Sequence, residues 1–294
     1  MMKTKLASKV LPLLLTTALI SCGGALPGMG GGNVDPNACG AIDTSDVGRK
    51  VKTFLEATAK LDTAAKGMAD GVKQACLDMG TELGMTAPSG DTKTVCNAVV
   101  AELQASMKVA IKADAKLTIV AKPAECTVNA EVAASAKAAC EGSASGDAAA
   151  SSGGDAKASG AAAGSCEASA NVNASLEATC TPPEVTVDAD ASVVVDAAKL
   201  EKVKAAITKG LPKILELQAK AKLLAEATVK FAETAKALVA AASDLAGAFA
   251  GKAALCVSGQ LAAAGKAVGS IQANVSVSVE VSASVSGSAS GGAQ

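Results

Sequence analysis

Residues 200–249 read LEKVKAAITKGLPKILELQAKAKLLAEATVKFAETAKALVAAASDLAGAF and form the longest periodic stretch of the chain. Apolar or small residues recur in it at alternating steps of three and four: Leu200, Val203, Ile207, Gly210, Ile214, Leu217, Ala221, Leu224, Thr228, Phe231, Ala235, Leu238, Ala242, Leu245 and Phe249. Such spacing is typical of one buried stripe along a helix. Because Gly210 and Pro212 should kink or restart the helix, the stretch predicts two collinear helices, together about 75 Å long at 1.5 Å per residue.

A second stretch with helical spacing, residues 47–79, is the expected partner of this stripe within the chain. Glycines and a proline follow it, and residues 91–114 predict another helix that folds back antiparallel to the first. Cys76 would then meet Cys96. Residues 47–79 are fewer than residues 200–249, which leaves two interpretations of the stripe from 224 to 249. It belongs to the core, or it docks on a helix of a second copy or of another protein.

Two segments bounded by cysteines, 126–140 and 166–180, repeat each other in spacing and in their alternation of Val or Ala with polar residues. Alternation of this kind predicts half-buried strands. An antiparallel pairing joins the first cysteine of each repeat to the second of the other, as Cys126–Cys180 and Cys140–Cys166. A parallel pairing joins the two first cysteines and the two second ones. We favour the antiparallel pairing because it needs only a loop between the strands.

Alternation also predicts strands over 184–196 and 274–286, whereas 141–165, mostly Ala, Ser and Gly, predicts a disordered loop. Four carboxylates share the outer face of the first of these strands: Glu184, Asp188, Asp190 and Asp196. Calcium is bound by such oxygens. A solvated strand face is the commoner outcome, so we predict no metal site.

These elements together predict an α+β fold, in which long Ala-rich antiparallel helices pack on an antiparallel β-sheet and disulfides staple the body. The body covers residues 39–286 in this order: a helical hairpin (39–115), a β-rich part (116–196), long helices (197–273) and a strand (274–286). Residues 287–294 form a disordered tail. Ala and Val side chains bury little apolar area, so at ~25 cal/mol per Å² each contributes little to the free energy of folding. Disulfides, at about 2–4 kcal/mol each, would add to this stability.

The composition excludes several classes of function. The chain has 27 basic and 28 acidic residues, no His, Trp or Tyr, and a single arginine, Arg49. Without His it lacks the usual general base and the commonest zinc ligand. Without Tyr, Trp or a basic surplus it does not resemble a nucleic-acid binder. We therefore expect no catalytic residues, no enzyme activity, no cofactor and no nucleic-acid partner.

The N-terminus has the features of an export signal. Lys3, Lys5 and Lys9 precede an apolar segment, 10–20, that is too short to span a bilayer. The end of this segment and the two residues after it read Leu-Ile-Ser-Cys, residues 19–22, which resembles the lipobox of bacterial lipoproteins. The resemblance implies removal of residues 1–21, diacylglycerol on the Cys22 thiol, further acylation such as palmitate, and anchoring in a membrane. A plain secretory signal with an ordinary Cys22 is the alternative.

The residues after Cys22 bear on where the chain resides. By resemblance to lipoprotein sorting, Gly23 and Gly24, in place of an aspartate, favour the outer membrane of the cell envelope, facing the periplasm or the surface. Residues 22–38, rich in Gly and Pro, predict a flexible tether. With Cys22 lipidated, eight cysteines remain for up to four disulfides. These are Cys39, Cys76, Cys96, Cys126, Cys140, Cys166, Cys180 and Cys256.

Two functions fit this organisation. The first is a cell-envelope lipoprotein with a structural or protein-interaction role, whose partners are the membrane, reached through Cys22, and another envelope protein or a second copy. The alternative is a lipoprotein that carries an apolar ligand, such as a lipid, in a cavity between helices and sheet. A void lined by Val and Leu would favour the carrier, and a filled core would favour the interaction protein.

Overall fold

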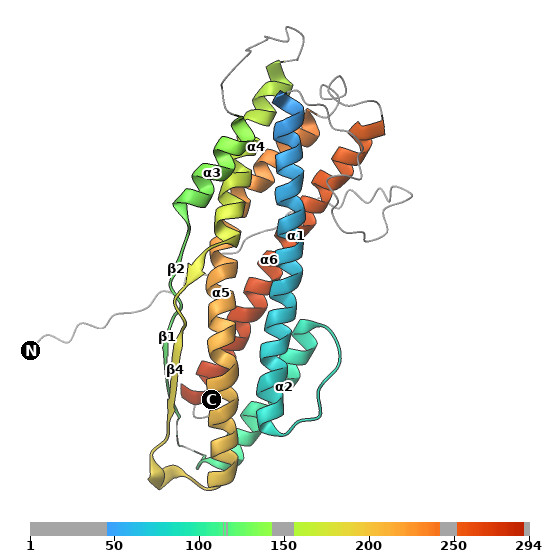
Figure 1. The fold of residues 1–294 in the computed structure, drawn as a ribbon. Helices are drawn as coiled ribbons and strands as arrows, with labels where there is room; N and C mark the ends of the chain where they lie inside the picture. Colours follow the sequence, from blue (N-terminus) through green and yellow to red (C-terminus); the bar gives the residue numbers. More distant parts are fainter. Residues whose placement is uncertain (1–45, 114, 116, 143–155, 242–251, 291–294) are drawn as a thin grey trace, which may run out of the picture. The chain divides into compact units, whose positions relative to one another are not determined.

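Three long helices form the frame of the protein, which the computed structural model describes over residues 46–113, 115, 117–142, 156–241 and 252–290 (Figure 1). They are α1 (Asp46–Leu83), α5 (Ala197–Ala240) and α6 (Lys252–Ser290), and each packs against the other two. α5 runs antiparallel to α1, since Phe54 stacks on Phe231 while Gly71 lies against Leu217. α6 runs parallel to α1, because its earlier residues pack with the first half of α1 and its later ones with the second half.

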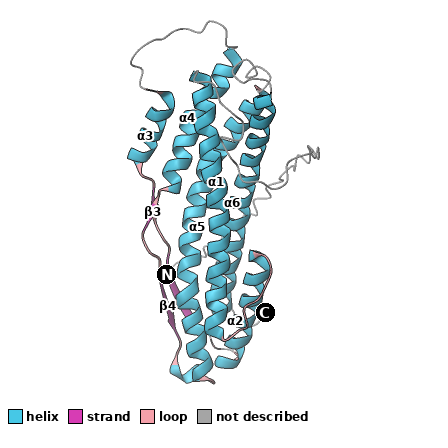
Figure 2. Cartoon of the chain, turned by 45° about the vertical axis from the view of Figure 1, so that its right-hand side comes forward, coloured by secondary structure: helices cyan, strands magenta, loops and turns pink. Residues whose placement is uncertain are grey.

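Shorter helices complete the packing on the two halves of this frame (Figures 1 and 2). α2 (Thr92–Ala110) covers the second half of α1, and α4 (Ala156–Leu176) packs on both α1 and α5, with α3 (Ala130–Glu141) against it. Two clusters of buried side chains result. One contains Phe54 and Phe231, and the other contains Met79, Leu103 and Ile214.

α2 runs parallel to α1, so the predicted antiparallel hairpin is wrong. Thr92 Oγ1 donates to the carbonyl of Ala69, whereas Val99 lies against Gly80, so positions on the two helices advance together. The loop 84–91 makes the return. Its eight residues span about 26 Å when extended, which is enough to cover the distance of about 21 Å along the α1 axis from Leu83 back to the level of Ala69. Helical spacing alone does not indicate whether a loop of this length reverses the chain direction.

The chain between α2 and α5 runs out and back, so that its first half pairs with its second half (Figure 1). β1 (Thr118–Lys122) pairs antiparallel with β4 (Glu184–Asp188), and further along β2 (Cys126–Thr127) pairs antiparallel with β3 (Thr179–Cys180). α3 and α4 follow as a helical pair. The inner residues of the β1–β4 ribbon, among them Ile119 and Val187, join the second cluster. The predicted antiparallel β-structure is therefore present, but only as two small two-stranded sheets.

The predicted strands over 126–140 and 166–180 are wrong except at their ends, because α3 and α4 occupy most of both repeats. Asn129 caps α3 by accepting hydrogen bonds from the amides of Glu131 and Val132, and Gly142, at φ 74°, follows its last turn. Ala supplies most of the apolar positions in both repeats. Ala is the best helix former and is depleted in strands, so alternation built on Ala indicates no strand. The predicted loop 141–165 also becomes helical from Ala156, and residues 143–155 lie outside the described part.

The predicted strand 274–286 is also wrong, since these residues belong to α6. Beneath the Val/Ser alternation lies a helical spacing: Ile271, Asn274, Ser278, Val281 and Val285 are buried at steps of three and four. Packing on α1 and α5 therefore overrides the strand preference of Val. Asn274 is accommodated because its Nδ2 donates to the carbonyl of Ala65 at 3.0 Å. Residues 287–290, predicted as tail, extend the same helix.

α5 is one continuous helix, not two, and Pro212 lies inside it. Its predicted stripe is buried from Leu200 to Leu238 with the exception of the half-buried Leu217, so this part belongs to the core of the same chain. The end of the stripe, 242–249, lies outside the described residues. Gly210 lets α5 cross close to α1, because a Cβ there would overlap the side chain of Met79.

Candidate functional site

The predicted anchor cannot be followed in the structure, because residues 1–45, with Cys22 and Cys39, lie outside the described part. Cys256 falls within α6, but its side chain is also outside the described set, so the participation of Cys39 and Cys256 in disulfides stays a prediction. Within the described ranges, no helix combines the length and the apolar character needed to cross a bilayer.

Three disulfides close the described body: Cys76–Cys96, Cys126–Cys180 and Cys140–Cys166. The last two are the partners that the antiparallel pairing of the repeats predicts, although helices replace most of the strands. The reason is geometric. In any antiparallel pair the residue numbers of opposite partners have a constant sum, here 126 + 180 = 140 + 166 = 306, whether the elements are strands or helices.

The three disulfides differ in their exposure to solvent. Cys76, Cys96, Cys140 and Cys166 are at most 1% exposed, whereas Cys126 and Cys180 are half-buried on the two-residue strands β2 and β3. Thiol–disulfide exchange requires in-line approach of a thiolate, so exposure controls its rate.

We predict that Cys126–Cys180 is the first of these disulfides to be reduced. Limited treatment of the native protein with a dithiol, followed by alkylation and peptide mapping, should label Cys126 and Cys180 before the other four cysteines. Repeating the treatment in denaturant is the control and should remove the order. Earlier labelling of Cys76 or Cys140 in the native protein would contradict the prediction.

Three of the four carboxylates considered for calcium accept hydrogen bonds from separate donors. Glu184 accepts a hydrogen bond from Lys122 at 2.7 Å, which lowers the pKa of Glu184. Asp190 accepts from the amide of Ser192, and Asp196 caps α5 by accepting from the amide of Lys199. Across the described residues, no group of three or more Cys, Asp or Glu side chains is placed to hold a metal ion. The structure therefore does not bring these carboxylates together as a site.

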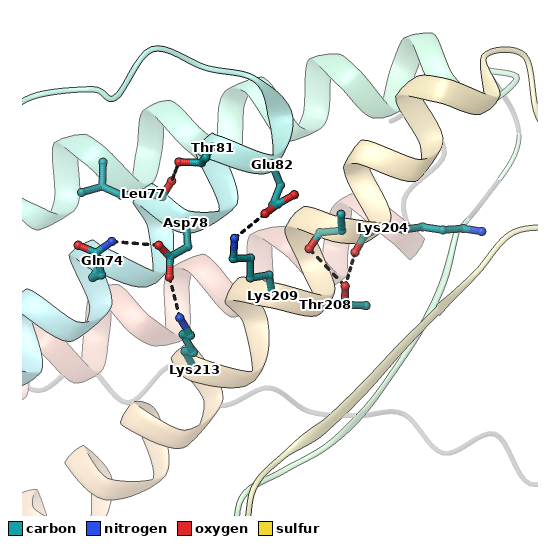
Figure 3. Close-up of polar contacts among 10 residues, drawn as sticks. Gln74, Leu77, Asp78, Thr81, Glu82, Lys204, Thr208, Lys209 and Lys213 are labelled. Atoms are coloured by element: carbon teal, nitrogen blue, oxygen red, sulfur yellow. Dashed lines mark hydrogen bonds and ion pairs between the residues drawn. The ribbon is translucent and has the colours of Figure 1, made fainter.

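Two ion pairs join α1 to α5 (Figure 3), through lysines that precede and follow Gly210 in the chain. Lys213 Nζ lies 2.7 Å from Asp78 Oδ2, and Lys209 contacts Glu82 one turn along. The hydrogen bond from Lys213, together with one from Gln74 at 2.9 Å, lowers the pKa of Asp78. Glu82 in turn raises the pKa of Lys209. These pairs align the two antiparallel helices.

We expect Asp78→Asn to lower the free energy of unfolding by about 0.5–1 kcal/mol at neutral pH, as for other partly exposed ion pairs. Because the pKa of Asp78 in the folded state is below the ordinary value of 3.8, its contribution is present at neutral pH and is lost as the pH falls below that value. Urea titrations followed by far-UV circular dichroism should show variant and wild type converging in acid. A difference that persists in acid would contradict the ion-pair explanation.

Glu56→Gln is the matched control for this experiment. It removes only an exposed pair with Lys52 at 4.0 Å and should change stability by at most a few tenths of a kcal/mol.

An open groove of about 470 Å³ lies where the segment between β1 and β2 passes over α5 and α6. Its lining comes from these three segments: Pro123, Ala124, Leu215, Gln218, Ala219, Lys222, Val279, Ser282, Ala283 and Ser286. The α5 and α6 residues follow helical steps of three and four, and six of the ten are apolar. Sequence reasoning missed this groove because its walls are more than 50 residues apart in the chain. The small residues beside the main stripe of α5 were the available signal.

A second groove, of about 410 Å³, lies between α1, α3 and α4 and has a different character. Its lining is mostly polar and carries both signs of charge: Lys60, Asn129, Glu131, Val132, Ser135, Ala136, Asn173 and Glu177. Lys60 already donates to Asn173 Oδ1 at 3.0 Å. The mixed charge and this internal hydrogen bond indicate no ligand class.

The large apolar side chains of the described cores are fully buried, among them Phe54, Leu61, Leu103, Ile214 and Leu224. Comparisons with known protein families, with curated proteins and with solved structures found no match to this chain.

Proposed function

We propose that this chain is a lipid-anchored protein of the cell envelope with a structural or protein-interaction role. The observation that carries the proposal is the construction of the body: three long helices pack against one another, and three disulfides join α1 to α2, β2 to β3 and α3 to α4. Disulfides of this kind persist in oxidising compartments, which agrees with export. The lipobox-like residues 19–22 supply the anchor, and 22–38 supply the tether.

The large side chains buried between the described helices support a rigid body. Because the stripe of α5 is buried within the chain as far as Leu238, a partner protein must contact other faces. The partner in this proposal is another envelope protein or a second copy, and the outer membrane is the proposed location.

We expect Cys22→Ala to move the protein from the membrane fraction to the soluble fraction, or to leave it unprocessed. Two or more acyl chains hold a protein firmly at a bilayer, and without the thiol none can be attached. Fractionation and metabolic labelling with a fatty acid measure both effects. Ser21→Ala, which keeps a small residue before the cysteine, is the control and should behave as wild type. Unchanged fractionation and labelling of Cys22→Ala would reject lipidation.

A second candidate function is the binding of an apolar ligand. The observation that favours it is the groove between α5, α6 and the β1–β2 segment, which has the volume typical of small-molecule sites, about 300–1,000 Å³. It is an open groove and not the enclosed cavity that the sequence suggested.

A further inference from the structure

The groove over α5 and α6 combines an apolar surface with a single charge. Leu215, Ala219, Val279 and Ala283 supply apolar or small side chains along its walls, and Pro123 covers it from the β1–β2 segment. Val279 is 43% exposed, one of the large apolar side chains that the fold leaves in contact with solvent. A ligand lying along the groove would remove this surface from water.

The charge of the groove is positive. Lys222 is the only charged residue of the lining, and the lining contains no carboxylate. Five other lysines of α5 form ion pairs: Lys204, Lys209, Lys213, Lys220 and Lys230. Lys222 has no carboxylate within 4 Å among the residues described. The groove therefore complements a ligand with one apolar portion and one anionic group.

The polar side chains of Ser282 and Gln218 in the lining are consistent with a ligand that has one apolar portion and one anionic group. Ser282 Oγ lies 3.0 Å from the carbonyl oxygen of Val279 and 3.5 Å from Gln218 Oε1, so its single hydroxyl hydrogen has an acceptor within the chain. The wall from Leu215 to Lys222 is about 10 Å long at 1.5 Å per residue. An extended chain lying along α5 would thus place its polar end at Lys222.

We infer that this groove binds the head-group end of a long-chain fatty acid, with the carboxylate at Lys222 and the adjoining part of the acyl chain along the groove between α5 and α6. The inference rests on the second candidate function, and it names the ligand class for that groove.

Titration of the full-length chain carrying Cys22→Ala with oleate and with oleyl alcohol tests this inference. The substitution removes the chain's own acyl groups as competitors, and the two probes differ in the charge of the head group. Oleate should bind more tightly. Lys222→Gln should weaken oleate binding about threefold, as expected for a partly exposed ion pair, and leave oleyl alcohol unchanged. Lys236→Gln, an exposed lysine on the same helix, should change neither.

A second pair of variants tests the apolar part. Ala219→Leu combined with Ala283→Leu fills the groove and should weaken both probes more than about tenfold, whereas the exposed Ala237→Leu should not. Far-UV circular dichroism establishes that each variant is folded. Absence of oleate binding, unchanged binding in the folded filled variant, or equal effects of Lys222→Gln and Lys236→Gln would overturn the inference. None of these outcomes affects the test of anchoring, which depends on fractionation alone.

Discussion

Phe231→Ala should lower the free energy of unfolding by about 4–5 kcal/mol, the largest effect expected of a single substitution in the described body. Phe231 and Phe54 are both fully buried, and their rings stack with centroids 4.0 Å apart. Removing a buried Phe costs about 3–5 kcal/mol, and loss of an aromatic pair adds about 0.5–1.5 kcal/mol. Since stabilities are typically 5–15 kcal/mol, the variant should be close to unfolding.

The measurement is urea unfolding followed by far-UV circular dichroism, because the chain has no Trp or Tyr for fluorescence. Val229→Ala, at a position 56% exposed on the same helix, is the control and should change stability by no more than about 0.5 kcal/mol. If Phe231→Ala proves as mild as Val229→Ala, the stripe of α5 is not the core.

Gly210→Ala should destabilise the protein by about 1–2 kcal/mol, although alanine favours a helix over glycine by about 1 kcal/mol. A Cβ at position 210 would lie 2.6 Å from Met79 Sδ and 3.0 Å from the carbonyl oxygen of Ala75. The oxygen belongs to the backbone of α1, so the two helices would have to separate. Urea unfolding measures the loss.

Gly67→Ala is the matched control, because a Cβ there would have no atom within 4 Å. The gain in helix propensity should then appear alone and stabilise the protein by about 0.5–1 kcal/mol. Adding Met79→Ala to Gly210→Ala removes the nearest side-chain atoms, so the double variant should lose less than the sum of the single ones. Effects of the same sign at Gly210 and Gly67 would contradict the close crossing.

Predictions from sequence succeeded where one local rule was sufficient. The spacing of Leu200, Leu224 and Phe231 predicts a helical stripe because only residues three and four apart share a helix face. The equal cysteine spacing of the two repeats allows a parallel and an antiparallel set of partners, and the antiparallel set, favoured because it needs only a loop, is the one that forms. The lipobox-like residues and the composition remain the basis for the proposals on location and role.

The residues that line the groove could not be grouped from the sequence alone. Leu215 and Lys222 lie on α5, Val279 and Ala283 on α6, and Pro123 on the segment that passes over both. Each of these residues is unremarkable within its own helix or loop. Only the packing of α6 against α5 makes a shared surface from them.

The sequence by itself predicted the helical stripe of α5 as far as Leu238 and favoured the partners of Cys126 and Cys140 that form. The tertiary structure decided the state of residues 274–286, where Val alternates with Ser but Val281 and Val285 also share a helical face with Ile271. It likewise decided the direction of α2 and the continuity of α5 through Pro212. The reason is that local periodicity fits more than one structure here. The free energy that selects among them comes from burial against residues far apart in the chain, such as Asn274 against Ala65 and Gly210 against Met79.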